Sequence, residues 1–574
     1  MIIIRFIFIC FSILLILIFS IILFKPIIFS QIPNIQSNLK IFDFILEDKI
    51  MWQNTKIMYI LLIILNTSII SNYLYSKFIH KILNSKKENP QLPNIDLSKL
   101  HLTIGKDKEE KLIYLSEKSL YQNILITGGI GTGKTASAMY PFTKELIDYM
   151  ANNKEEKLGF LILDVKGNYY QKVKEFAKSS NRENDVIVIE LNGKYTYNPL
   201  NKPNLKASIL ANRLKTILLL FSPNNTESYW IDKAEQVIES LITYCRIYNH
   251  GYVTFEELHK LVTDKTYYSL KLNEARNIFL SGILNEEQVY DLLTSINFLE
   301  KDFFSLDDRT LNLLKSEITR ITNCFVSDYE VLKTFCPSKY KENFLGFEET
   351  INKGKIVVLN LNIGKYKNLS KIIAAYLKLD FQTDVIAQLS NKVIRPMVFI
   401  SDEYQEYVTS SDAEFFAQSR EAKCINIVAT QSYTSLLHTI NNQYSVNVII
   451  QNLVNKLWFR TDDIYTIEDA QKQIGKEDKE KLSKTISENS KESNYNYLVK
   501  KFTSVDSNLS ESINTYSQFD YTYDYNFFTQ ELETFSCLAF LSDGNKIIKP
   551  CKLQMIPYFK KEVQNNGKEN KFRK

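Results

Sequence analysis

A short glycine-rich stretch holds the residues whose types and spacing have the clearest chemical use. After an apolar run that begins at Asn123, the chain reads Gly128-Gly-Ile-Gly-Thr-Gly-Lys-Thr135. Glycines at this spacing let the backbone turn tightly, so that its N–H groups and the next helix N-terminus face an anion. We expect a phosphate-binding loop made of Gly128, Gly129, Ile130, Gly131, Thr132, Gly133, Lys134 and Thr135.

The last two residues of this loop predict the rest of the ligand. Lys134 supplies a point charge for the terminal phosphates, and Thr135 offers a hydroxyl to Mg²⁺. The expected cofactors are therefore ATP and Mg²⁺. The alternative is a glycine turn that joins a strand to a helix and binds nothing.

A pair of carboxylates forms the second chemical landmark. The segment from Pro396 is apolar and ends in Asp402 and Glu403. At the tip of a buried strand, one carboxylate can hold Mg²⁺ through water while its neighbour orients or deprotonates the attacking water. We expect Asp402 to serve the metal and Glu403 the water, the alternative being ordinary acids in a turn.

Gln431 follows another expected strand, 425–429. At a strand tip its amide could sense whether a γ-phosphate is present. The alternative is an amide that hydrogen-bonds its own loop. Between the carboxylates and this strand, a helix is expected over 412–423, and it carries Arg420.

The expected site residues follow different strands, so one sheet must hold the ends of those strands together. Apolar runs at 159–164, 185–190 and 355–361 alternate with helical patterns. Such alternation predicts a doubly wound α/β sheet, with ligands at the carboxyl ends of its strands.

Two stretches break the alternation. From Trp230 apolar residues recur every three or four positions to about Cys336, which predicts an inserted all-helical domain, set at 230–345. Residues 473–518 are polar and predict a flexible insertion. After them, 535–541 and 546–548 predict a closing hairpin.

The N-terminal region predicts a membrane anchor, set at 1–83. Residues 6–24 carry no charge and are long enough to cross a bilayer, and 57–75 form a second uncharged stretch. A cleaved signal peptide is the alternative for the first. Lysines after the second stretch indicate that the N-terminus and the soluble body are cytoplasmic. Residues 84–96 have the composition of a linker.

Charge and cysteine content limit the function less sharply. The net charge of +5 over 574 residues does not by itself indicate a nucleic-acid binder, so any DNA-binding surface must be local. The 7 cysteines are dispersed and predict reduced packing residues. The last segment, 560–574, is a basic tail.

Taken together, these motifs resemble the type IV secretion coupling proteins, the TraG/TraD-like conjugative ATPases. The resemblance covers two N-terminal membrane stretches and a series of motifs in chain order. These are Gly128 to Thr135, Asp164-Val-Lys-Gly167, Tyr197-Asn-Pro-Leu200, Tyr229-Trp230, Asp402-Glu403, Arg420 and Ala429-Thr-Gln-Ser432.

The resemblance implies a RecA-like P-loop ATPase domain, in parts 97–229 and 346–559, and six subunits around a channel. Such a motor would pass a relaxase-bound single DNA strand, and possibly protein, to the channel components of a type IV secretion system. In this family an arginine at the place of Arg420 acts across the subunit boundary, so Arg420 joins Glu403 and Gln431 as an expected catalytic residue. Two alternatives are an FtsK-like DNA pump and a non-catalytic substrate receptor.

Overall fold

The computed structural model describes residues 48–74, 96–164, 166–220, 228–489, 495–496, 501–502 and 508–560. The chain divides into two compact units, Met1–Gln91 and Leu92–Lys574. The stretch expected to span a membrane at 6–24 lies outside the described residues, as do most of the expected linker and the tail from 561.

The first unit contains one described helix, α3 (Lys49–Leu74). It includes nearly all of the second expected membrane stretch, but polar residues interrupt the apolar ones at Asn66, Thr67, Ser68, Ser71 and Asn72. Among the residues that the structure describes, no helix has both the length and the apolar content to cross a membrane. The span expected at 57–75 is therefore not found.

The second unit is built on a sheet of 11 strands in the order β2-β1-β15-β14-β9-β3-β8-β7-β4-β6-β5. The strands from β9 to β5 run parallel. They are β9 (Asn455–Phe459), β3 (Ile124–Thr127), β8 (Cys424–Thr430), β7 (Met397–Ser401), β4 (Gly159–Leu163), β6 (Ile356–Leu359) and β5 (Val186–Ile189). The doubly wound α/β sheet is thus confirmed, and the expected site residues other than Arg420 lie at its carboxyl-end edge.

The other side of the sheet is antiparallel. β14 (Ser536–Phe540) pairs with β9 and with β15 (Cys551–Gln554), and β1 (His101–Lys106) follows with β2 (Leu112–Ser116). The closing hairpin therefore returns through 551–554, and not through 546–548 as expected. Ile547 makes only an isolated bridge with Ser542. Between these two residues, the Asp543 carboxylate accepts hydrogen bonds from the backbone N–H groups of Asn545 and Lys546, which holds the chain in a tight turn.

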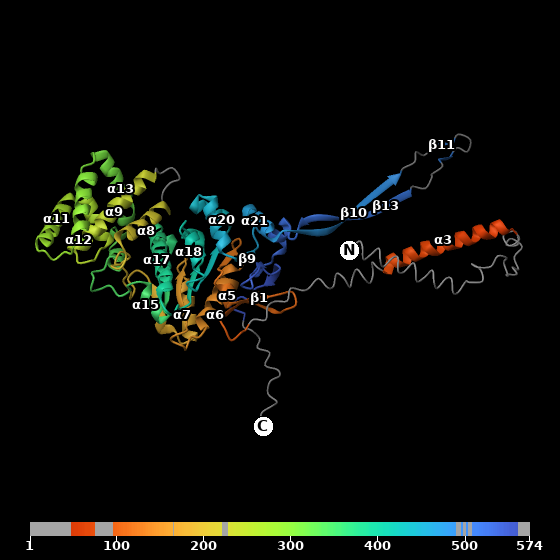
Figure 1. Ribbon diagram of the computed structural model, residues 1–574, viewed down its shortest axis with the longest axis horizontal. Coiled ribbons are helices and arrows are strands. Elements are labelled where there is room, and N and C mark those ends of the chain that lie inside the picture. Colours follow the sequence, from red (N-terminus) through yellow and green to blue (C-terminus); the bar gives the residue numbers. More distant parts are fainter. Residues whose placement is uncertain are drawn as a thin grey trace, which may run out of the picture. The chain divides into compact units, whose positions relative to one another are not determined.

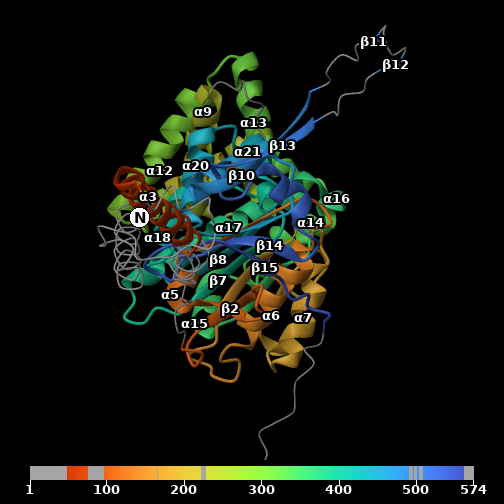
Figure 2. The same ribbon diagram turned by 90° about the vertical axis from the view of Figure 1, so that its right-hand side faces the viewer.

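Helices cover both faces of this sheet. On β3, Ile124 and Ile126 pack into one hydrophobic core and Leu125 into the other, as the two-residue repeat of a strand requires. In Figures 1 and 2, α6 (Tyr140–Asp148) and α7 (Tyr169–Ser179) lie on one side of the strands and α20 (Gln443–Asn452) and α21 (Ile464–Ile474) on the other. The remaining short or covering helices are α5 (Glu117–Leu120), α16 (Ile363–Tyr366), α17 (Asn368–Ala387), α18 (Asp412–Gln418) and α19 (Tyr433–Ile440).

Between β5 and β6 the described residues form helices and no strand. These helices are α8 (Ala207–Leu220), α9 (Ser228–Tyr248), α10 (Phe255–Thr263), α11 (Lys265–Leu280), α12 (Glu286–Phe298), α13 (Asp308–Val326), α14 (Tyr329–Phe335) and α15 (Phe347–Lys353). Most of them gather at one end of the second unit (Figure 1). Phe255 and Phe325 stack at their centre with ring centroids 4.0 Å apart, which joins α10 to α13.

The polar segment expected to be flexible forms a long ribbon instead. β10 (Lys476–Asn489) and β13 (Asn508–Tyr521) pair antiparallel along their whole length, from Lys476 opposite Tyr521 to Asn489 opposite Asn508. Two short strands, β11 (Tyr495–Asn496) and β12 (Lys501–Phe502), also pair. The ribbon could not be predicted from composition alone, because many charged and polar residues are also typical of a solvated, unstructured segment. The Ile, Thr and Tyr residues at intervals within it favour strands.

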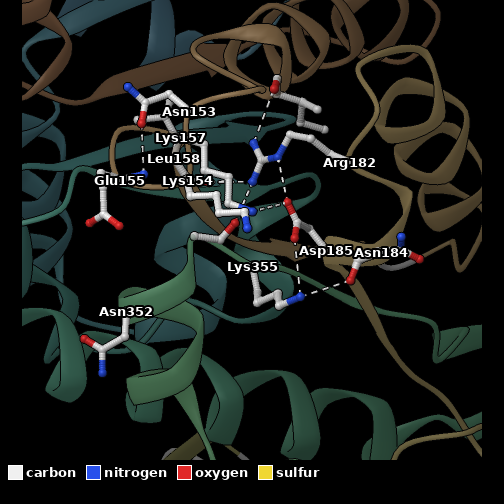
Figure 3. A network of polar contacts seen from close by, with 12 residues as sticks. Asn153, Lys154, Glu155, Lys157, Leu158, Arg182, Asn184, Asp185, Asn352 and Lys355 are labelled. Atoms are coloured by element: carbon white, nitrogen blue, oxygen red, sulfur yellow. Dashed lines mark hydrogen bonds and ion pairs between the residues drawn. The ribbon is translucent and has the colours of Figure 1, made fainter.

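A cluster of charges fastens the amino ends of the parallel strands (Figure 3). The Arg182 side chain is 1% exposed and donates hydrogen bonds to the carbonyls of Leu158 and Gly354, which precede β4 and β6. Its Nε also lies 3.2 Å from Asp185 Oδ2. Lys157 and Lys355 pair with the same carboxylate at 2.6 and 3.3 Å. We call Arg182, Asp185, Lys157 and Lys355 the Arg182 cluster.

Candidate nucleotide-binding site

The glycine-rich loop follows β3 directly, at the carboxyl edge of the parallel strands. Its shape requires glycine at position 133, where φ is 97°. A Cβ there would also lie 2.4 Å from Cδ1 of Phe535. Thr132 stabilises the turn by donating from its hydroxyl to the carbonyl of Gly129 at 2.9 Å. The loop then enters the helix that begins at Thr135, so backbone N–H groups gather at one place.

Lys134 folds back over this loop. Its ammonium group donates hydrogen bonds to the carbonyls of Gly128 and Gly129. Burial lowers the pKa of Lys134, although the carboxylates of Glu403 and Asp402 act in the opposite direction. A buried cation whose hydrogen bonds to the described residues all go to neutral carbonyls is well placed to take an anion as its partner.

Thr135 and Asp402 meet as the sequence predicted for a shared metal. The Thr135 hydroxyl donates to Asp402 Oδ2 at 3.0 Å, which brings two oxygen ligands together beside the loop. Asp402 is 2% exposed, and its burial raises the pKa of its carboxyl group. A buried carboxylate with only a hydroxyl and a backbone N–H as close donors suits a hard cation.

Glu403 lies next to this pair and is held by three neighbours. Gln405 and Gln431 donate amide hydrogen bonds to its Oε2 at 2.8 and 3.0 Å, and Lys166 Nζ lies 3.4 Å from its Oε1. Burial alone would raise the pKa of Glu403, but these donors and the nearby cations hold it below its ordinary value. The side chain is therefore an ionised acceptor in a fixed orientation.

A buried ion pair positions the backbone of Glu403. Glu403 has a left-handed conformation with φ of 51°, which costs free energy for a residue other than glycine. The following residue, Tyr404, donates to Asp412, whose carboxylate pairs with Lys378 at 2.6 Å. Lys378 also donates to the carbonyl of Tyr407 at 2.7 Å. This network ties the segment after Glu403 to α17 and α18.

Asp164, at the tip of β4, has a structural use. Its carboxylate accepts from the backbone N–H groups of Lys166, Asn168 and Tyr169. It therefore caps the start of α7 and shapes the turn from which Lys166 reaches Glu403.

The structure brings most of the predicted site residues together. Glu403 and Gln431 are in contact, as are Asp402 and Thr135, and Lys134 lies beside them. Sequence reasoning missed Gln405 and Lys166. Lys166 follows a buried strand that ends in an acid, so its place at a strand tip was a usable signal; Gln405 offered none.

Arg420 is the exception. It lies beyond the end of α18, in the turn before β8, and not on a helix over 412–423 as expected. The helix ends early because the chain must turn into β8. In this turn the carbonyl of Ser419 accepts a hydrogen bond from the backbone N–H of Cys424. β8 has 7 residues, so it places Arg420 about 20 Å from Gln431, at the opposite edge of the sheet. Its side chain is exposed and contacts no other described residue through a hydrogen bond or ion pair.

An open cleft of about 820 Å³ adjoins the loop on the side of Gln431. Its walls come from the loop tip, the start of α19 and the segment after β9, including Ile130, Thr434, Asp462, Asp463 and Glu468. The acids of this cleft make it unfavourable for phosphates, which leaves the Lys134 side of the loop for them.

The residues present fit a magnesium nucleoside triphosphate. The loop supplies N–H donors and an ammonium group, Thr135 and Asp402 supply oxygen ligands, and Glu403 supplies an ionised acceptor beside them. Each element that the sequence assigned to phosphate and metal is therefore at one edge of the sheet.

Comparisons with known proteins agree with this architecture. No family model and no curated protein matches the sequence. Among solved structures, the unbound bacterial conjugative coupling protein TrwBdeltaN70 is similar over 83% of this chain and 91% of its own, with 12% identity and a TM-score of 0.52. Plasmid coupling protein TrwB in complex with ADP and Mg²⁺ covers 77% and 87%, with 12% identity and a TM-score of 0.51.

A third structure, TrwB in complex with the non-hydrolysable GTP analogue GDPNP, covers 77% of this chain and 88% of its own, with 12% identity and a TM-score of 0.50. Identities this low establish the fold alone. The resemblance to conjugative coupling proteins that the sequence motifs indicate is thereby confirmed at the level of the fold, and this chain has the fold of TrwB.

Proposed function

We propose that this protein is a membrane-anchored ATPase that drives a relaxase-bound single DNA strand, and possibly protein, into a type IV secretion channel. The observation that carries the ATPase activity is the convergence of Lys134, Thr135, Asp402 and Glu403 on one loop. The TrwB-like fold supports the transport role.

In this proposal the residues divide the work of hydrolysis. Lys134 and the loop N–H groups would bind the phosphates. Thr135 and Asp402 would hold Mg²⁺, which would supply positive charge to the phosphate oxygens. Glu403 accepts the proton of the attacking water. Gln405, Gln431 and Lys166 keep its carboxylate ionised and fixed in direction.

We propose that Arg420 acts in an assembly of several subunits. Because Arg420 lies at the opposite edge of the sheet from the phosphate loop, with the 7 residues of β8 between the two edges, its side chain is too far from the nucleotide of its own chain. A neighbouring subunit in a ring, which we propose to be a hexamer, can bring this guanidinium to the γ-phosphate, where it stabilises the charge of the transition state.

Two substitutions test the ATPase proposal. Glu403→Gln should bind ATP but hydrolyse it about 100-fold more slowly or worse, because an amide orients water without accepting its proton. Lys134→Ala should lose both binding and turnover. Lys178→Ala, an exposed residue of α7, is the matched control. ATP turnover that persists in Lys134→Ala would contradict this site. Absence of turnover in the unaltered protein would favour a receptor without catalysis.

The cargo can be tested separately. Binding of the detergent-solubilised protein to single-stranded oligonucleotides should weaken steeply with salt and depend little on sequence, because a motor grips phosphates and does not read bases. Salt-independent binding, or none by assembled rings, would contradict DNA as the cargo and favour protein.

We also propose that residues 6–24 attach the protein to the bacterial inner membrane, because 19 uncharged residues suffice to cross it. Deleting residues 1–30 should move the protein from the membrane to the soluble fraction. If the deleted form remained in the membrane fraction after a high-salt wash, the anchor would lie elsewhere.

A further inference from the structure

An aromatic cluster borders the phosphate loop. It consists of Phe535, Tyr558 and Phe559, whose rings meet edge to face, with Phe559 6.0 Å from Phe535 and 5.5 Å from Tyr558 between centroids. The Phe559 side chain is 58% exposed. The mechanism proposed above makes no use of these rings.

Backbone hydrogen bonds fix this cluster to the loop. The N–H of Phe535 donates to the carbonyl of Thr132 at 3.0 Å, and the N–H of Tyr558 donates to that of Ala136 at 3.0 Å. The Phe535 ring occupies the space that a side chain at Gly133 would need. The aromatic surface therefore begins where the phosphate loop ends.

The order of strands decides which end of a nucleotide reaches it. Glu403 and Gln431 follow β7 and β8, on one side of β3, whereas Phe535 precedes β14, on the β9 side of β3. A triphosphate bound with its terminal phosphate at Glu403 would leave the loop toward the other side, where Phe535 lies. Its base would then lie at the aromatic cluster.

Phe535 is held in an unfavourable conformation at this place. Its φ of 63° is left-handed, which is costly for an aromatic residue. Two backbone hydrogen bonds hold Phe535 in this conformation. Its N–H donates to the carbonyl of Thr132, and its carbonyl accepts from the N–H of Met555 at 2.8 Å. Such strain is found where a side chain must be presented at a binding site.

We infer that Phe535, Tyr558 and Phe559 form the base-binding subsite of the nucleotide and stack a purine ring against the exposed face of Phe559. This inference rests on the proposed ATPase function and assigns its base site. Stacking on an aromatic face suits any base, and the large purine face gains most from it.

Comparing two ligands tests the subsite. Titration calorimetry on the full-length protein in detergent, with Mg²⁺, would compare adenylyl imidodiphosphate with inorganic tripolyphosphate, which has no base. Phe559→Ala should weaken the first about tenfold, the usual loss when a base loses a stacking partner. Tripolyphosphate should bind as before, and Phe559→Trp should retain nucleotide affinity.

Tyr340→Ala, at a ring that is 97% exposed elsewhere in the unit, should change neither ligand. Equal loss of both ligands in Phe559→Ala, or no loss of either, would overturn the inference. A loss with Tyr465→Ala and not with Phe559→Ala would place the base in the acidic cleft instead. If neither ligand bound the unaltered protein, the ATPase proposal itself would fail.

Discussion

The two edges of one parallel sheet carry polar groups of opposite character. At the amino edge, the Arg182 cluster pairs every charge with a carboxylate or a carbonyl of the same chain. At the carboxyl edge, the described residues give Lys134 only neutral carbonyls as hydrogen-bond acceptors, and they give Asp402 a hydroxyl and a backbone N–H as donors. Charges that are fully paired inside the chain stabilise the fold, whereas incompletely paired ones are available to a ligand.

Arg420 breaks this division, since it lies at the amino edge and yet has no hydrogen-bond or ion-pair partner among the described residues. An exposed arginine can be an ordinary surface charge worth a few tenths of a kcal/mol. If Arg420 serves a neighbouring subunit, however, the amino edge of one chain completes the carboxyl edge of the next.

The largest expected effect tests this point. Arg420→Ala should lower ATP turnover of assembled rings by about a thousandfold without altering stability, because arginine fingers contribute on that scale. Mixing it with Lys134→Ala should restore part of the activity, since about a quarter of randomly formed interfaces would then combine an intact Arg420 with an intact phosphate loop.

The matched control mixes Lys134→Ala with the double variant Lys134→Ala/Arg420→Ala. That mixture has no intact phosphate loop and should stay inactive. If mixed rings form but ATP turnover does not recover, Arg420 is an ordinary surface charge and does not act on a neighbouring subunit.

A second substitution has the opposite signature. Arg182→Met should destabilise the protein by about 3–5 kcal/mol, because it removes one of the three cations around Asp185 and leaves three buried carbonyls without their Arg182 donor. The thermal unfolding midpoint should fall, while turnover per folded protein stays close to that of the parent. Lys174→Met, on the exposed side of α7, controls for the loss of a positive charge. Turnover that fell as far as stability would mean that the two edges are not separable.

The smallest effect concerns pH. Burial alone would raise the pKa of Asp185, but hydrogen bonds and charges from Lys157 and Arg182 hold it below its ordinary 3.8. A carboxyl whose folded-state pKa is depressed stabilises the fold above its unfolded pKa and loses that contribution as the pH falls through the folded one. The difference in unfolding midpoint between parent and Asp185→Asn should therefore shrink below about pH 4. A constant difference from pH 7 to pH 3 would argue against an ionised Asp185.

The sequence predicted the sheet and the main site because both depend on local patterns. Apolar runs mark β4 and β7, and a glycine spacing marks the loop. Contacts between residues far apart in the sequence have no such local pattern. Phe535 approaches Gly133 from 402 positions further along the chain, and Lys378 reaches Asp412 from another helix. The ribbon was missed because pairing of two polar strands depends on their register and not on hydrophobicity.

The ribbon itself raises a question of solubility. Within the described residues, β10 and β13 pair only with each other, so each presents an outer row of unpaired N–H and C=O groups. Open strand edges recruit further strands from other copies and lead to aggregation. Lys476-Glu-Asp-Lys-Glu-Lys481 places alternating charge along one such edge, and another strand could pair there only by burying those charges. The charged composition that made the segment resemble a flexible insertion is thus also the composition that disfavours pairing of a further strand along the described part of this edge.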